Sequence, residues 1–511
     1  MLKRVRLSPD ARDVSLRGDL RELENYHLLH GCVIPSETEG VSRGVQFADC
    51  LSQVKDIFAA QEKTLRDAGR IGGHQSVSSD NLLSPRVFFC GGGDYAADVA
   101  GFREQMVDAG LGDVAGRTVF IPAPPVEGDV GVFFEARYPK DGKLMDIRHR
   151  VSERFGIQYA IIYHEDVTDY QVMQLVPGVY TEGLTERSTI LERAVRVEEA
   201  YGQFERDVLM PNGLSFHDIV CSRNYVGEII REEVSASGKT LQAYQVVLND
   251  PRAHHYGLLE DFPQERPPTA TGIGANDWDG VVFVVTLGTG ERNAFGNPMQ
   301  TDAHAYDQPI LVGASLPTGE KGGVSPPPDA SEAAPGESLK RPPYFSRLVV
   351  YDNERIYVAG TASIRGAGTI YKLEDFHGPE WVDVGNAAKM VGGKDGLEAM
   401  FGAGNVMEDD HHRLRLRADS AVEAQSFVTI DNIAALIHKD NLEQNGVAGE
   451  ATFNDLTHLI VYIKRPEDAD NVMRIHRRFF PDNPMIGVVC DVCRGDLEME
   501  TEAEGVLRKN G

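Results

Sequence analysis

One pattern recurs three times along this chain of 511 residues: a long helical stretch followed by short strand-like runs. Apolar residues repeat every three or four positions in the three helical stretches, at residues 47–65, 191–208 and 427–437. Ser188 is predicted to cap the second helix. Continuous apolar runs predict strands at residues 87–90, 118–121, 132–136, 219–225, 281–287, 459–463 and 486–489. Each copy therefore predicts a helix packed on a sheet, and the whole chain an α+β fold of repeated units.

The same recurrence divides the chain into units. We predict a first domain in residues 1–150, a second in 151–312 and a third in 344–511. Residues 313–343 are rich in Pro, Gly and Ser, which predicts a flexible linker or a long surface loop. Residues 366–419 show no clean periodicity, and we interpret them as an insertion in the third domain that serves as a lid or an assembly contact.

Charge and hydropathy exclude several classes of partner. The chain has 51 Lys and Arg against 78 Asp and Glu, a formal net charge of −27. Most of such a surface repels a phosphate backbone, so no nucleic-acid partner is expected. No apolar run approaches the length that spans a bilayer, and no apolar segment follows the basic N-terminus. We therefore expect no membrane partner and a cytoplasmic location.

Cysteines and histidines give no strong metal signal. The six cysteines are scattered and too few for a disulfide scaffold. Cys490 and Cys493 have a spacing that suits a redox pair or a zinc site. However, no second pair completes a zinc site, and the adjoining apolar run predicts a strand with reduced, buried thiols. His254 and His255, and the acidic and histidine-rich residues 408–412, are predicted to lie in solvated loops, because adjacent histidines rarely bind one ion with good geometry. We expect no metal.

A series of short motifs occurs in one order along roughly residues 190–511. The motifs are Arg223-Asn-Tyr225, Asn249-Asp-Pro-Arg252, residues 268–274, Asn297-Pro-Met-Gln300, Phe345-Ser-Arg347, residues 356–366 and residues 493–503. Together they resemble the chorismatases, or chorismate hydrolases, which are built on the YjgF/Rid (chorismate mutase-like) fold. The resemblance implies tandem Rid-like domains, each a mixed sheet with packed helices. Because Rid domains assemble as trimers, three copies in one chain could form an internal pseudo-trimer, either as a monomer or within a homo-oligomer.

The first unit resembles a degenerate copy of the third. Residues 132–136 match residues 499–503, and Phe133 stands where the third unit has Glu500. An aromatic ring cannot replace a functional acid. The resemblance therefore places the site in the third unit.

The resemblance implies a hydrolase that protonates the enolpyruvyl ether of a carboxylated cyclic substrate, chorismate or a similar compound, and releases pyruvate without a cofactor. Glu500 matches the family's proton donor. On a strand, Glu498, Glu500 and Glu502 share one face, and neighbouring negative charges raise a carboxyl pKa. A raised pKa would keep Glu500 protonated near neutral pH.

Further residues match substrate-contacting positions of the family. They are Gln300, Arg347, Gly360, Thr361, Ala362, Ser363, Tyr462, Cys493 and Arg494. The planar fork of an arginine suits a substrate carboxylate. Small residues let a ring approach the backbone. Each of these residue types also has ordinary structural uses, such as packing in an apolar strand or pairing at the surface.

Two other functions are open at this point. One is a Rid-type imine or enamine deaminase, which uses an Arg directly after the Pro before its penultimate strand, whereas Pro484 is followed here by Met485. The other is a non-catalytic ligand-binding or scaffold protein of a biosynthetic pathway, which the degenerate first unit would suit. The joint presence of Glu500, Arg347 and Gln300 favours at least one working site.

Overall fold

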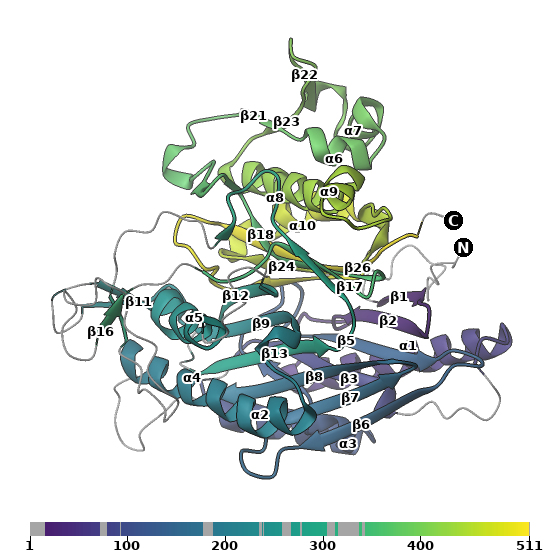
Figure 1. Cartoon of the computed structure of the whole chain (residues 1–511). Coiled ribbons are helices and arrows are strands. Elements are labelled where there is room, and N and C mark those ends of the chain that lie inside the picture. Colours follow the sequence, from purple (N-terminus) through teal and green to yellow (C-terminus); the bar gives the residue numbers. More distant parts are fainter. Residues whose placement is uncertain are drawn as a thin grey trace.

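Three large sheets form the body of the protein (Figure 1). The computed structural model describes residues 16–71, 79–91, 93–176, 188–234, 238, 240–257, 267–275, 278, 280–303, 312–314, 337–339 and 343–509. Every predicted strand and all three predicted helices overlap an element of that type. The predicted α+β fold with mixed sheets and packed helices is confirmed.

The first sheet has five strands in the order β1-β2-β5-β3-β4. They are β1 (Leu16–Glu22), β2 (Tyr26–Val33), β3 (Leu82–Phe89), β4 (Val119–Ile121) and β5 (Val130–Pro139). Three helices pack on it: α1 (Arg43–Asp67), α2 (Tyr95–Asp108) and α3 (Gly112–Ala115). The apolar stripe of α1, which includes Phe47 and Leu51, faces the sheet and is buried.

The second sheet has six strands in the order β12-β9-β13-β8-β7-β6. They are β6 (Met145–Val151), β7 (Gln158–His164), β8 (Val167–Val176), β9 (Ile219–Gly227), β12 (Thr269–Ala275) and β13 (Val281–Gly288). Its helices are α4 (Ile190–Phe204), which continues as a π-helical turn, the π-helical segment η5 (Tyr244–Asn249) and α5 (Asp250–Gly257). The predicted cap at Ser188 was wrong by one residue, because Thr189 and Glu192 form a reciprocal capping box.

The third sheet has six strands in the order β14-β17-β18-β26-β24-β25. They are β14 (Arg292–Phe295), β17 (Leu348–Tyr351), β18 (Arg355–Ala362), β24 (Leu456–Ile463), β25 (Met485–Val489) and β26 (Met499–Val506). Its helices are α8 (Ala421–Ile437), α9 (Lys439–Gln444) and α10 (Ala469–Phe479). Strand β14 comes from before residue 313 and pairs with β17, so the second predicted domain contributes an edge strand to the third sheet.

The three sheets share one topology. In each, two antiparallel strands lead into a helix and a third strand, and a further connection leads to a fourth strand parallel to the third. The parallel pairs are β3-β4, β9-β12 and β24-β25. The last strand then returns to the centre of its sheet, as β26 does between β18 and β24. The threefold recurrence in the sequence thus corresponds to a threefold recurrence of topology.

The sheets meet face to face in the interior. Phe133 of β5, Tyr225 of β9 and Ile460 of β24 belong to one apolar cluster. Beside it, Nη1 of Arg86 on β3 lies 3.0 Å from Oε1 of Glu502 on β26, and both side chains are buried. Buried charged groups need partners of opposite charge, and this ion pair joins the first sheet to the third. The interior therefore joins all three units through both apolar and ionic contacts.

The insertion at residues 366–419 forms a small layer of its own over α8 (Figure 1). It contains β20 (Gly368–Thr369), β21 (Glu380–Asp383), α6 (Gly385–Met390), α7 (Gly393–Phe401), β22 (Val406–Glu408) and β23 (Leu414–Ala418). Val382 and Leu416 pack in one core with Phe427 of α8. With the sheet on one side and this layer on the other, every residue of α8 except Glu423 is buried.

Two remaining predictions concern the surface. Most of residues 313–343 lie outside the described residues; at the two ends of this segment, β15 (Val312–Ala314) pairs with β16 (Glu337–Leu339). A second small hairpin pairs β10 (Glu232–Val234) with β11 (Thr240–Gln242). Among the described helices none has the length and apolar character needed to cross a membrane.

Candidate active site

A cavity of about 320 Å³ lies where the second and third sheets meet. The second unit supplies one wall from β12, η5 and α5, and the third unit supplies the other from β18 and β26. Strands β12 and β18 lie against each other here, and the backbone N–H of Gly360 on β18 donates to Thr271 Oγ1 on β12 at 3.0 Å. The cavity is therefore built by two units together.

Glu500 is the carboxyl group of this cavity. It lies on β26 between Ala362 and Tyr462 of the neighbouring strands and is 3% exposed. Burial raises its pKa to about 7, against the opposing positive charge of Arg347. The thiol of Cys493 donates to its Oε2 at 3.7 Å. A carboxyl group in this environment carries a proton over much of the neutral range.

The raised pKa agrees with the sequence-based expectation, but its main cause does not. Burial is the largest cause, and the negative charge of Glu502 raises the pKa less. Glu498 lies one residue before β26, where its Oε2 is 3.1 Å from Arg465 Nε. The prediction was therefore wrong for Glu498, which lies outside the strand, whereas the smaller contribution of Glu502 agrees with it.

Gly360 brings the backbone of β18 against this acid. A Cβ at this position would lie 1.8 Å from Glu500 Oε1 and 3.0 Å from Thr271 Cγ2. Real Cβ atoms do not approach other atoms so closely. The absence of a side chain at Gly360 is thus a condition for the observed position of the carboxyl group.

Three guanidinium groups line the same cavity: Arg252 of α5, Arg347 before β17 and Arg494 after β25. Arg252 and Arg347 are 2% and 4% exposed. Nη2 of Arg252 donates to Asn249 Oδ1 at 2.6 Å. Nη1 of Arg494 donates to the carbonyl of Ala367 at 3.1 Å and lies nearer the surface. Buried guanidinium forks beside a protonated acid suit a carboxylated ligand.

Six of the ten residues singled out in the sequence line the cavity: Arg347, Gly360, Ala362, Cys493, Arg494 and Glu500. Thr361 and Ser363 do not. Thr361 alternates with Gly360 and Ala362 along β18, and Ser363 follows the end of that strand. Their hydroxyls donate to the carbonyls of Ala359 and Ile370.

Gln300 and Tyr462 also lie outside the cavity lining. The amide of Gln300 donates to the carbonyl of Ile364, a cavity residue, at 3.2 Å. Tyr462 is fully buried between sheets, and its hydroxyl lies 3.2 Å from that of Tyr225. Contact of either side chain with a ligand would require a rearrangement, whereas support of the cavity wall would not.

The wall from the second unit was largely missed in the sequence. It includes Gln242, Tyr244, Gln245, Leu248, Arg252, Ala270 and Gly272. The motif at residues 249–252 contains Arg252 and could have identified it, but the motif by itself assigned it no role. No local signal distinguishes the polar residues around η5 from any other surface-type segment, because their role depends on which strand of another unit they meet.

The Cys-X-X-Cys pair does not lie in a strand, and that prediction was wrong. Strand β25 ends at Val489, and the chain then turns so that Cys490 packs in the interior between sheets while Cys493 lines the cavity. Both are free thiols, and burial raises the pKa of each.

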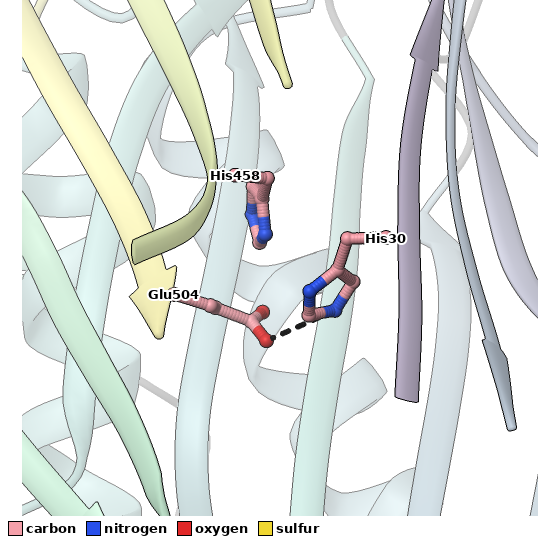
Figure 2. Close-up of side chains that lie close together, drawn as sticks. All are labelled: His30, His458 and Glu504. Atoms are coloured by element: carbon pink, nitrogen blue, oxygen red, sulfur yellow. Dashed lines mark ion pairs between the residues drawn. The ribbon is translucent and has the colours of Figure 1, made fainter. Parts of the chain in front are cut away.

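Figure 2 shows a second group of polar residues, in the interior between the first and third sheets. Nitrogen and oxygen atoms of His30, His458 and Glu504 lie within 4.8 Å of one another, and His30 Nε2 is 3.5 Å from Glu504 Oε2. These are metal-ligand types. However, Glu504 already pairs with Arg223 and, at 3.1 Å, with Arg355. Two guanidiniums therefore compensate its charge without a metal ion.

The buried His458 makes the stability of the folded protein depend on pH in a direction that can be predicted. Burial, together with the neighbouring His30 and the positive charges of Arg86 and Arg223, holds its pKa well below the usual 6.5. The unfolded chain therefore binds a proton here that the folded chain does not, and stability falls as pH falls below about 6.5.

We expect His458→Leu to flatten this fall by up to about 1.4 kcal/mol per pH unit, because the variant has no group to protonate. Denaturant unfolding at several pH values between about 5 and 7 measures the slope. The exposed His411 offers a control, since His411→Ala should leave the slope unchanged. Equal slopes for wild type and His458→Leu would contradict the assignment.

The adjacent histidines lie on a helix, so their prediction as a solvated loop was wrong. His254 Nδ1 and His255 Nε2 of α5 lie 2.5 Å and 3.1 Å from Glu198 Oε1 of α4, and His255 is buried. One carboxylate thus bridges two helices. Residues 408–412, in contrast, run from the end of β22 into a turn and are mostly exposed, as predicted.

Several known proteins are similar to parts of this chain, although no family model matches it. A chorismatase of Streptomyces rapamycinicus is 25% identical over 241 residues, which are 46% of this chain and 50% of that protein. A 3-hydroxybenzoate synthase of Streptomyces hygroscopicus is 24% identical over 285 residues, 55% of this chain and 61% of that protein. The chain thus spans about half the length of the first of these curated relatives.

A crystal structure of a chorismatase has the same overall fold. It superposes with a TM-score of 0.50 over 85% of this chain and 96% of that chain, at 19% identity. The structural match therefore extends well beyond the part that aligns in sequence.

Proposed function

Because this chain is a relative of the chorismatases, we propose that it is a hydrolase that releases pyruvate from the enolpyruvyl ether of a carboxylated cyclic substrate, chorismate or a close analogue. The observation that carries the proposal is Glu500. It is a buried carboxyl group with a pKa raised to about 7, in a cavity lined by three guanidinium groups. Such a cavity can hold an anionic ring beside a neutral acid.

The reaction begins with a proton transfer to carbon. Neutral Glu500 gives its proton to the methylene carbon, and the electron pair of the alkene forms the new C–H bond. The adjoining carbon becomes an oxocarbenium ion, which the Glu500 carboxylate stabilises. Water adds to this cation and returns a proton to the carboxylate. The resulting hemiketal then breaks its bond to the ring oxygen, which takes up a proton, and pyruvate leaves.

Arg252 and Arg347 are the proposed clamps for substrate carboxylate. They are the two buried guanidiniums of the cavity, and they come from its opposite walls, α5 and the segment before β17. Holding the anion from both sides would fix the alkene over Glu500. Arg494, which is more exposed, would act at the cavity mouth.

Protonation of carbon has a direct test. Purified protein is incubated with chorismate in D₂O, pyruvate is trapped at once by reduction to lactate, and products are identified by mass spectrometry. We expect one solvent deuterium in the methyl group and an equal amount of a ring acid. Pyruvate without deuterium would refute proton donation to carbon. Ammonia from an imino acid, with no turnover of chorismate, would instead support a deaminase.

The same acid predicts the pH profile. Only the protonated form of Glu500 can donate, and its pKa is about 7. We therefore expect kcat/KM to be level at lower pH and to fall about tenfold per unit as pH rises above about 7. Initial rates of pyruvate release across this range measure the effect. A rate that rises with pH through this region would contradict a carboxylic acid donor.

We also propose that the three units are Rid-like domains that reproduce a trimer within one chain. Their shared topology and their common interior support this arrangement. In the sequence of the first unit Phe133 matches the acid Glu500, and its ring lies 4.1 Å from the Arg86 guanidinium carbon. One unit thus replaces an acid by a packed ring. Light scattering of the purified chain would distinguish a monomer from a homo-oligomer.

A further inference from the structure

An aromatic ring lies under both proposed clamps. The guanidinium carbon of Arg347 is 4.8 Å from the centroid of the Phe345 ring, and that of Arg252 is 5.7 Å from it. Both distances are within the range in which the negative face of a ring attracts a cation. We propose that Phe345 is a positioning residue that holds the two guanidiniums together as one subsite for a carboxylate. This inference rests on the proposed function.

The ring is held firmly at the junction of two units. Phe345 is 9% exposed and packs against Ala270 of β12 and Ala359 of β18. Its neighbour Ser346 donates its backbone N–H to the carbonyl of Pro268 at 2.9 Å. Packing between the two strands and this hydrogen bond hold the Phe345 ring in place. A ring held in this way can position the side chains of Arg252 and Arg347.

The chemistry of the ring matters because the two guanidiniums carry the same charge. A carboxylate between them would also hold them, but it would cancel the charge that a substrate needs. A ring attracts each cation through its quadrupole and leaves the net charge in place. Among the described residues Arg252 forms no ion pair with a carboxylate; it donates to the neutral amide of Asn249, and its buried Nε has no partner. The charge of Arg252 is therefore available to an anion, and the ring brings it beside that of Arg347.

The ring also connects two units. Arg347 follows Phe345 by two residues, whereas Arg252 comes from α5 of the second unit. An aliphatic side chain of similar volume would fill the space between Ala270 and Ala359 without attracting either cation. Loss of the ring should then let Arg252 and Arg347 move apart, which weakens binding of a carboxylate more than it changes proton transfer.

The test weakens the negative potential of the ring face, which attracts the cations, and keeps the shape of the ring. Mono-, di- and trifluorinated phenylalanine are placed at position 345 by suppression of a stop codon, and Phe345→Leu is made in parallel. Steady-state pyruvate release from chorismate gives KM and kcat. We expect KM to rise step by step with fluorination and about tenfold in Phe345→Leu, with kcat changed by less than about threefold.

A matched control lies between α10 and the insertion, where the guanidinium carbon of Arg478 on α10 is 4.9 Å from the centroid of Phe401 in the insertion. Phe401→Leu removes an equivalent contact away from the cavity and should leave KM unchanged. If Phe345→Leu fails to fold, the fluorinated series decides, since its members are nearly isosteric. A KM that is flat across the fluorinated series would overturn the inference.

A binding measurement distinguishes failure of the proposed function from failure of the inference about Phe345. If wild type releases no pyruvate, binding of 3-hydroxybenzoate, a carboxylated ring, is measured by calorimetry for the same variants. Weaker binding along the fluorinated series would support the role of Phe345 in a carboxylate subsite without the reaction. Equal binding across the series, or no binding to wild type, would overturn it.

Discussion

Glu500→Gln protein is expected to fold normally and to release pyruvate from chorismate about 10² to 10⁴ times more slowly than wild type. The amide has nearly the shape of the acid but no proton that it can give to carbon. A coupled assay for pyruvate measures the rate, and circular dichroism checks the fold. Glu498→Gln is the matched control, because Glu498 lies two residues away, pairs with Arg465 and does not line the cavity.

The stability of this variant should also differ, and in a known direction. The pKa of Glu500 is about 7 in the folded protein and 4.5 in the ordinary carboxyl group. Wild type therefore loses stability as pH rises from about 4.5 to about 7, by about 3 kcal/mol in total, because the folded state retains a proton that the unfolded state releases. Glu500→Gln lacks this loss and should gain in relative stability across the same range. In the pyruvate assay, equal rates for Glu500→Gln and wild type would show that Glu500 is not the proton donor.

Gly360→Ala is expected to lower kcat by about a hundredfold or more, because the new methyl group occupies the position of the Glu500 carboxyl. A Cβ on this residue falls 1.8 Å from Oε1, so the acid or the strand must move. Overpacking of this kind also destabilises a core, by about 1 to 3 kcal/mol. Steady-state kinetics and denaturant unfolding measure the two effects.

Gly368→Ala is the comparison for this change. Gly368 lies on β20, a few residues further along the chain, and a Cβ there meets nothing within 4 Å. It should retain both activity and stability. A Gly360→Ala enzyme with wild-type kcat would show that the carboxyl group does not need its present position.

Local pattern in the sequence accounts for most of the elements but not for how they meet. Apolar periodicity identified α8, and continuous apolar runs identified the strands β24 and β25, since burial selects apolar residues directly. The alternation of side chains along β18 could also have separated Gly360 and Ala362 from Thr361 in advance. Resemblance alone grouped these three together, and only the strand geometry divides them.

The missed residues share a physical reason. Arg252 acts in a cavity whose acid lies far along the chain, and its position depends on the contact between β12 and β18. Nothing within a local window reports such a contact. The pKa of Glu500 shows the same limit, because the degree of burial that raises it is a property of the packed molecule. The turn after Val489 likewise depends on the packed molecule, because it places Cys490 in the interior between sheets and Cys493 in the cavity.

Strand β14 crosses from the second predicted domain into the sheet of the third. If the chain is divided at the Pro-rich segment, residues 313–343, the C-terminal fragment has an unpaired edge at β17. The N-terminal fragment carries β14 without the strand that it pairs with. Either fragment expressed alone should therefore aggregate. Co-expressed fragments can assemble through the pairing of β14 with β17.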